Sequence, residues 1–445
     1  MEALSRMVNV NPLILSTAKT YMVVSNLLDT ISESALKSLL PRLIVVQIFL
    51  GEDKKYFLRR LRVLCIFRGS LIIFNWYIMK SKCGICVFVF LMLFISCDRL
   101  ERNSLSIPVE VIDFDALKKE TLSELMNKEK PEYILLKNDT VNELFGRIDK
   151  IKIAGKKIYI ADTRMRSLIV YDCMGNYLAR VGTRGQGPKE YINLSDFDVD
   201  TNGNVYVLDS RLNKVLQYSD KYECVEECML PFAADILAVL NNDSLLFGLS
   251  SWNEKDGAKR KIALTDKKGK IGRTYLDYDE FVDPGYWISG YMFADAGCQL
   301  AYNQTIDNNV YIFSRKGVLE KGFFINFGEE NVPNRDKVEI ESKLRNFDYY
   351  CLIRKILAVT DKYIIGFIWQ HRQTKPFVID YNSKKCYLGD MVPDIDRRVW
   401  CGYSEGNLVS YIDSENEELP DSVNQFIRQE GIALKIDKLN KILNK

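Results

Sequence analysis

The chain has 445 residues and is 47% hydrophobic, which is enough for two ordinary domains or one large repeat fold with a sizeable core. Its 61 Lys and Arg nearly balance its 59 Asp and Glu, but residues 1–97 are basic and the remainder is mildly acidic. An acidic body lacks the basic footprint of a nucleic-acid-binding domain, so we expect no nucleic-acid partner. The 24 Tyr and 22 Phe favour sheets over helices.

The N-terminal region contains two apolar runs, beginning at Leu43 and Leu71, and both are too short to span a bilayer. From Met79 the chain reads as a signal peptide: two lysines, an apolar stretch, and an ending at Cys97 that resembles a bacterial lipobox. We predict that residues 79–97 are a lipoprotein signal, that Cys97 is acylated, and that residues 1–78 are an over-called extension. The alternatives are a genuine membrane-associated N-terminal segment, or a plain cleaved signal in which Cys97 is incidental.

Residues 98–130 are polar and charged, and they predict a tether, with a short helix or loop over Ala116–Lys130. The segment that begins at Pro131 then reads as a strand. Residues 131–445 form the predicted folded domain.

The domain opens with one sequence unit written twice, between Ile153 and Tyr218. Four residues of the first copy recur 47 positions later, as the pairs Tyr159/Tyr206, Asp162/Asp209, Arg164/Arg211 and Tyr171/Tyr218. Apolar residues alternate with a period of two between Gly, Asn and Asp turns, in which Gly175 and Gly203 supply positive φ. One such sheet cannot bury both of its faces, so the units must stack in a ring.

Later units are more diverged, over residues 245–276, 298–327, 355–388 and 399–412, followed by a closing strand after Gly431. The strand near Tyr133 would complete the last unit by joining the two ends of the chain. The fold class is therefore all-β, a β-propeller with six blades, and seven blades is the alternative.

These repeats resemble the NHL-type propeller repeat, and more closely the six-bladed β-propeller lipoproteins of anaerobic Gram-negative gut bacteria. The resemblance includes a shared turn after the first blade, formed here by Gly182, Gly185, Gly187, Pro188, Glu190 and Tyr191. It implies a propeller anchored in the cell envelope, in the outer membrane, but no activity. NHL repeats often carry Asn where Arg164 and Arg211 stand, so a role of that Asn does not carry over.

The glycine-rich turn from Gly182 to Pro188 lacks the Lys-Ser/Thr pair of a phosphate loop, so we expect a tight connection between blades with glycines at positive φ. Asp162 and Asp209 are expected to be structural and to accept hydrogen bonds from turn backbone. The alternative is a ring of charges at the central channel, with Arg164 and Arg211 recognising a ligand.

The candidate ligand-binding residues are aromatic. The insertion Tyr278–Phe293 carries Tyr286 and Trp287, and a second region carries Trp369 and His371. Aromatic rings pack on the apolar faces of sugars, but packing between blades is the alternative reading. A second insertion, Glu329–Tyr350, looks partly helical, and insertions on propellers commonly bind ligands.

The chain has 11 Cys and one His, without the spacing of a zinc site and without a Ser/His/Asp arrangement. We therefore expect no metal or cofactor and no catalytic set. The predicted function is a lipid-anchored binding or scaffold module for a glycan, a peptide or a partner protein. The alternative is a carbohydrate-active lyase, hydrolase or lactonase that uses channel carboxylates and Ca²⁺. Three or more carboxylates converging at the channel mouth would favour the enzyme.

Overall fold

The computed structural model describes the strands that lie between residues 43 and 93, and residues 107–443 with gaps at 138–145, 241–243, 254–259, 279–292, 297–298, 305, 339, 391–399 and 430. The chain divides into two compact units, Met1–Ser104 and Leu105–Lys445. In the part described, no helix is long and apolar enough to cross a membrane.

The first unit holds one antiparallel sheet, whose strands pair in chain order: β1 (Leu43–Asp53), β2 (Leu58–Phe67), β3 (Ser70–Met79) and β4 (Phe88–Leu93). Strand β4 lies inside the predicted signal segment, residues 79–97. Cys97 is outside the described residues.

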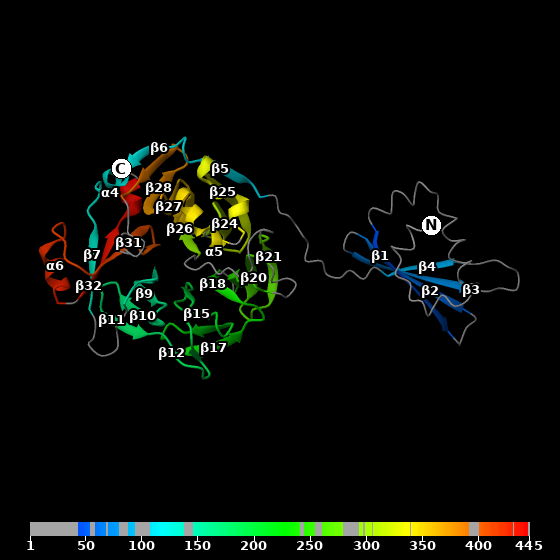
Figure 1. Ribbon diagram of the computed structural model, residues 1–445. Coiled ribbons are helices and arrows are strands. Elements are labelled where there is room, and N and C mark those ends of the chain that lie inside the picture. Colours follow the sequence, from blue (N-terminus) through cyan, green and yellow to red (C-terminus); the bar gives the residue numbers. More distant parts are fainter. Residues whose placement is uncertain are drawn as a thin grey trace. The chain divides into compact units, whose positions relative to one another are not determined.

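The second unit is a six-bladed β-propeller, in which six sheets stand around a central axis (Figure 1). This confirms the predicted fold class and six blades rather than seven. Blades 1 to 3 each have four strands, which pair in chain order from the centre outward. In blades 1 to 3 these are β8 (Lys150–Ala154), β9 (Lys157–Asp162), β10 (Ser167–Asp172) and β11 (Tyr177–Arg180); β14 (Asp196–Val199), β15 (Val205–Asp209), β16 (Lys214–Tyr218) and β17 (Cys224–Met229); β18 (Ala234–Val239), β19 (Ser244–Leu249), β20 (Ile262–Asp266) and β21 (Ile271–Tyr275).

Blades 4 to 6 also take strands from the N-terminal part of the domain: β5 (Val109–Asp113), β6 (Lys118–Thr121) and β7 (Glu132–Leu136). Their own strands are β22 (Ala294–Ala296), β23 (Gln299–Tyr302), β24 (Asn309–Ser314) and β25 (Leu319–Asn326); β26 (Cys351–Val359), β27 (Tyr363–Gln370), β28 (Gln373–Asp380) and β29 (Lys385–Leu388); β30 (Gly402–Ser404), β31 (Asn407–Ile412) and β32 (Ile432–Asp437).

The segment Val109–Leu136, which we call the N-terminal belt, lies along the outer edges of three consecutive blades. Strand β5 pairs in parallel with β25, β6 pairs in parallel with β29, and β7 pairs antiparallel with β32. The predicted closure by the strand near Tyr133 is therefore present in β7. From Val109 onward, however, the expected tether is part of the propeller, and it includes the short helix α4 (Leu122–Met126).

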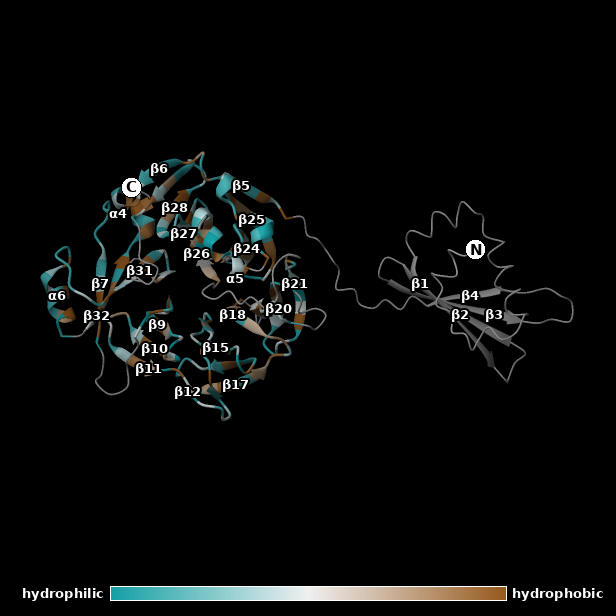
Figure 2. Ribbon diagram, viewed as in Figure 1, coloured by the Kyte–Doolittle hydropathy of each residue, from teal (hydrophilic) through white to brown (hydrophobic). Residues whose placement is uncertain are grey.

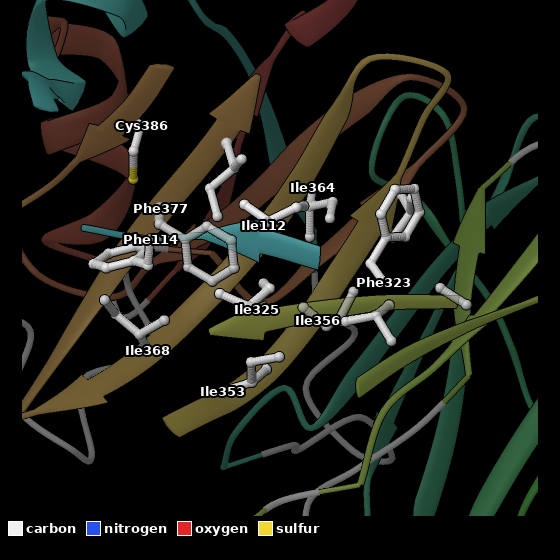
Figure 3. Packing of buried hydrophobic residues seen from close by; sticks show 14 of the residues in the cluster. Ile112, Phe114, Phe323, Ile325, Ile353, Ile356, Ile364, Ile368, Phe377 and Cys386 are labelled. Carbon is white, nitrogen blue, oxygen red and sulfur yellow. The ribbon is translucent and has the colours of Figure 1, made fainter. Parts of the chain in front are cut away.

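Inner strands are buried on both faces because neighbouring blades cover them. All five residues of β15 are buried, and six of the eight residues in β27 and in β28 are buried. Hydrophobic stretches are visible in the strands of the blades in Figure 2. Figure 3 shows the core between blades 4 and 5, where Ile112 and Phe114 of the belt lie among Phe323, Phe377 and Ile364. The belt therefore fills part of this core as well as covering strand edges.

The antiparallel order of each blade divides the turns between two ends of the propeller. At one end, which we call the insertion end, lie the turns from the second to the third strand and the connections between blades. It carries the insertion over 329–350, with η3 (Gly328–Glu330), η4 (Asn334–Asp336), α5 (Ile340–Lys343) and η5 (Leu344–Tyr349), and the glycine-rich turn with β12 (Thr183–Arg184) and β13 (Glu190–Tyr191). The other end, which we call the cleft end, carries the remaining hairpin turns. Helices α6 (Asp421–Ile427) and α7 (Leu439–Leu443) flank β32 in sequence.

Candidate functional site

The central channel is nearly filled. Residues of all six innermost strands surround a cavity of about 40 Å³, including Lys152, Asp198, Leu237, Ala294, Ile356 and Gly402. A cavity of this size has room for little more than a water molecule. The channel therefore does not offer a passage for a ligand through the ring.

Two buried ion pairs connect the innermost strands of blades 1 and 2. Lys150 Nζ lies 2.7 Å from Asp196 Oδ1, and Lys152 forms the equivalent pair with Asp198. The second oxygen of each carboxylate accepts a backbone N–H of β18, at 2.9 and 2.8 Å. Each aspartate thus links three consecutive blades, so these charged side chains have a structural role.

The environments of these two carboxylates shift their pKa values in opposite directions. Burial raises the pKa of Asp196, and the nearby Lys150 only partly offsets this. Burial acts to raise the pKa of Asp198 as well, but Lys152 and Lys150 together outweigh it and hold that pKa below its usual value. Asp198 thus has the stronger cationic surroundings.

Inside the channel, the carboxylates of Asp196 and Asp198 are engaged by lysines and backbone and do not converge with a third carboxylate among the described residues. Asp196 and Asp198 lie on one strand, and each is held by a lysine and by backbone. Within the residues that the structure describes, no group of three or more His, Cys, Asp or Glu side chains is placed to hold a metal ion.

A much larger hollow opens at the cleft end of the channel. This cleft has a volume of about 940 Å³. It is lined by turns from five of the six blades, which contribute Gly155, Thr201, Leu240, Lys267, Arg315 and Glu405. Its size is in the range of small-ligand and peptide sites.

The cleft lining is polar and apolar in nearly equal parts, and it carries charged side chains of both signs. Its cationic side chains are Lys152, Lys157, Lys267 and Arg315, and its acidic side chains are Asp200, Asp220 and Glu405. Lys152 is already paired with Asp198, and Lys157 Nζ lies 3.2 Å from the backbone oxygen of Asp220 and 4.8 Å from the ring centroid of Tyr222. The walls of the cleft therefore carry both positively and negatively charged side chains.

Asp162 and Asp209 are used as turn residues. Asp162 Oδ2 accepts the backbone N–H groups of Gly146 and Arg147, and its Oδ1 accepts that of Met165. Asp209 makes the corresponding bonds in blade 2, with the N–H groups of Ile192, Asn193 and Leu212, and it also accepts that of Arg211. Both side chains are fully buried at the insertion end, away from the channel lining. This geometry matches the structural interpretation of the repeated aspartates.

Arg164 and Arg211 follow these aspartates in the turns between second and third strands. Both side chains are exposed at the insertion end. Neither is among the described residues that line the channel cavity or the cleft.

The glycine-rich turn has two different requirements for glycine. Gly182 has φ = 72°, and an added Cβ would lie 2.3 Å from the hydroxyl oxygen of Tyr218. Gly185 and Gly187 do not have positive φ, contrary to expectation. A larger residue would not fit at either position because the Glu190 side chain folds over both. A Cβ on Gly185 would lie 1.9 Å from Glu190 Oε2, and this oxygen accepts the Gly187 N–H. Pro188 lies within this turn.

Trp369 and His371 attach the second insertion to its blade. Trp369 Nε1 donates to the carbonyl oxygen of Phe347 at 3.1 Å, and His371 Nε2 lies 3.0 Å from Glu330 Oε1. His371 has φ = 51° in the two-residue turn between β27 and β28. Tyr286 and Trp287 lie outside the described residues. The structure therefore brings Trp369 and His371 together with an insertion, at the end opposite the cleft.

Residues 109–442 match the model of a family described as a domain of unknown function, DUF4934. The chain belongs to this DUF4934 family. A search of the curated proteins finds no match.

Several solved structures are similar to this DUF4934 chain. A Bacteroides fragilis protein described as exported is 16% identical with a TM-score of 0.57, over 73% of this chain and 99% of that one. A member of the DUF4221 family from Bacteroides vulgatus is 9% identical with a TM-score of 0.45, over 69% and 96%. Virginiamycin B lyase from Staphylococcus aureus, solved as an inactive variant with quinupristin, is 9% identical with a TM-score of 0.36, over 88% and 99%. At these identities the likeness concerns the fold alone.

Sequence reasoning missed the cleft of this DUF4934 chain. Its lining residues are scattered along the chain from Lys152 to Asn440, and most of them stand in separate hairpin turns that are ordinary by themselves. A usable signal was present, since charged residues such as Lys267, Arg315 and Glu405 occupy turns that share one end of every blade.

Proposed function

We propose that this protein is a lipid-anchored binding module of the bacterial cell envelope, and that the cleft is its ligand site. The observation that carries the proposal is the 940 Å³ cleft, lined by charged turns, at the mouth of a channel that side chains fill. The ligand classes compatible with it are a glycan, a peptide or a segment of a partner protein.

The cleft has the construction of a preformed site. Its turns are fixed by the six sheets beneath them, and the ion pairs of Lys150 and Lys152 brace the strands from which these turns emerge. Rigid scaffolds that present loops are a recurrent basis of binding, because little conformational entropy is lost when the ligand binds.

The envelope location rests on the sequence around Cys97. Two lysines, an apolar stretch and a small residue precede this cysteine, in the order of a lipoprotein signal. Acylation at Cys97 would hold the propeller at the outer membrane.

Two matched substitutions test which end of the propeller binds. Thr201 is an exposed residue of the cleft lining, and Arg211 is an exposed residue of the same blade at the insertion end. We expect Thr201→Trp to fill the cleft and weaken binding at least tenfold, measured with the full chain on arrays of oligosaccharides and short peptides. Arg211→Trp should bind as the unmodified protein does.

Loss of binding in Arg211→Trp together with full binding in Thr201→Trp would move the site to the insertion end and contradict the proposal. As a control, thermal unfolding of both variants should be measured to check that each retains the folded propeller.

A further inference from the structure

The distribution of charge around the cleft indicates which class of ligand it takes. We infer that the cleft binds a short peptide segment that carries both a carboxylate and an ammonium or guanidinium group, rather than a neutral oligosaccharide. This inference rests on the proposed function, because it assumes that the cleft is the ligand site.

The cationic part of the cleft comes from two neighbouring blades. Lys267 lies in the turn between β20 and β21 of blade 3, and Arg315 lies in the turn between β24 and β25 of blade 4. Both side chains are half-buried. Each also interacts with groups of the protein itself, which restricts its position. Both side chains can donate hydrogen bonds to a carboxylate, and arginine can donate two parallel ones.

The acidic part comes from blades 2 and 6. Asp220 lies in the turn between β16 and β17, and Glu405 lies in the turn between β30 and β31. Both residues are exposed, and across the described parts of the chain neither carboxylate has a hydrogen bond or an ion pair. They differ in this from Asp200, whose carboxylate accepts the N–H groups of Asn202 and Asn204 within its own turn. Asp220 and Glu405 are therefore available to a cationic group.

The aromatic residues of the cleft argue against a neutral sugar. Recognition of a neutral sugar relies on exposed ring faces, but Tyr159 and Tyr206 are each only 1% exposed and pack in the cores between blades. Tyr403 is half-buried. Charged side chains, rather than ring faces, are what the cleft presents to a ligand.

A peptide has the matching chemistry because it separates opposite charges along an extended backbone. Lys267 and Arg315 would take its carboxylate, and Asp220 and Glu405 would take its amino or guanidinium group. Each charged hydrogen bond of this kind contributes more than a neutral one.

The test is a calorimetric titration of the full chain with three probes: pools of tetrapeptides Asp-X-X-Lys, a blocked tetra-alanine peptide, and maltotetraose. We expect the charged pools to bind at least tenfold more tightly than the two neutral probes, and their binding to weaken as salt is raised. Arg315→Gln and Glu405→Gln should each weaken the charged pools about tenfold. Lys316→Gln and Glu226→Gln, which alter charges outside the cleft lining, should not.

The outcomes separate this inference from the proposed function. Tight binding of maltotetraose that Thr201→Trp abolishes would overturn the inference and leave the cleft as the site. Binding that Thr201→Trp leaves intact would overturn both. Failure of the charged pools to bind the unmodified protein would also overturn the inference. So would binding of these pools by Arg315→Gln and Glu405→Gln that is as tight as binding by the unmodified protein.

Discussion

Asp196 and Asp198 stand two residues apart on one strand and make the same kinds of contact, yet burial and lysine charge balance differently at each. Asp196 has its pKa raised and Asp198 has its pKa lowered. A buried carboxylate stabilises the folded state only where its partners outweigh the cost of desolvation. We therefore expect the two residues to make opposite contributions to the dependence of stability on pH.

The prediction concerns Asp198→Asn and Asp196→Asn. The unfolded pKa of aspartate is about 3.9. Because the folded pKa of Asp198 is lower, its ionised form stabilises the protein above that value, and this contribution is lost as the pH falls through the folded pKa. Asp198→Asn should therefore lose stability less steeply on acidification than the unmodified protein. Urea unfolding between pH 2.5 and 7 measures this slope.

Asp196 should behave in the opposite way. Its folded pKa is higher, so its contribution is fully present below the unfolded pKa and is lost as the pH rises through the folded pKa. Asp196→Asn should therefore lose less stability than the unmodified protein as the pH rises through this window. A change of the same sign in both variants would contradict the assignment of opposite shifts.

The N-terminal belt is the element that joins the beginning of the domain to its later half. Its strands extend blades 4, 5 and 6, and its residue Phe114 packs edge to face on Phe327, with ring centroids 4.9 Å apart. The alternation along β5 places Ile112 in the core and Val111 outside, with exposed fractions of 5% and 62%. The belt is thus a structural part of the ring.

A pair of substitutions on β5 tests this role. Ile112→Asp would bury an unpaired carboxylate among apolar side chains, and we expect it to lower the free energy of unfolding by more than about 3 kcal/mol. Val111→Asp adds the same group on the exposed face and should change it by less than about 0.5 kcal/mol. Urea unfolding of the two variants measures the difference; equal stability would mean that β5 is a detachable tether.

Some of these elements could be predicted from the sequence, and others could not. The repeats around Tyr159 and Tyr206 are periodic and turn-bounded, so the blades follow from local pattern. Strand β6, Lys118–Thr121, is charged and largely exposed, and it is a strand because the edge of β29 lies beside it. The charged turns that carry Lys267 and Glu405 could be recognised from the sequence, but the cleft that they line exists only after the ring closes.

The molecule as a whole joins a propeller to an N-terminal unit that contains Cys97. The sequence predicts a lipid at this cysteine. If the lipid is attached there, the first described residue of the propeller unit, Ile107, follows the anchor by only ten residues. Ten residues span at most about 35 Å, so the propeller would stay close to the membrane surface.

Cys97→Ser tests this anchor in cells. We expect the variant to lose incorporation of a labelled fatty acid and to leave the membrane fraction, because the thiol is the site of acylation. Cys83→Ser and Cys86→Ser alter cysteines of the same signal segment and should change neither result. Mass spectrometry of the natural product checks the start site, and a peptide from residues 1–60 would contradict the prediction that residues 1–78 are not translated.

The belt also sets an order of events during synthesis. Its strands β5, β6 and β7 leave the ribosome first, but their partners β25, β29 and β32 are made later, the last of them about 300 residues downstream. At roughly 5–20 residues per second this delay is about 15–60 s. During that time blades 1 to 3 can assemble from neighbouring strands while β7 has no partner edge. The ring therefore closes only when the end of the chain has been made, and a nascent chain that stalls before β32 cannot complete its sixth blade.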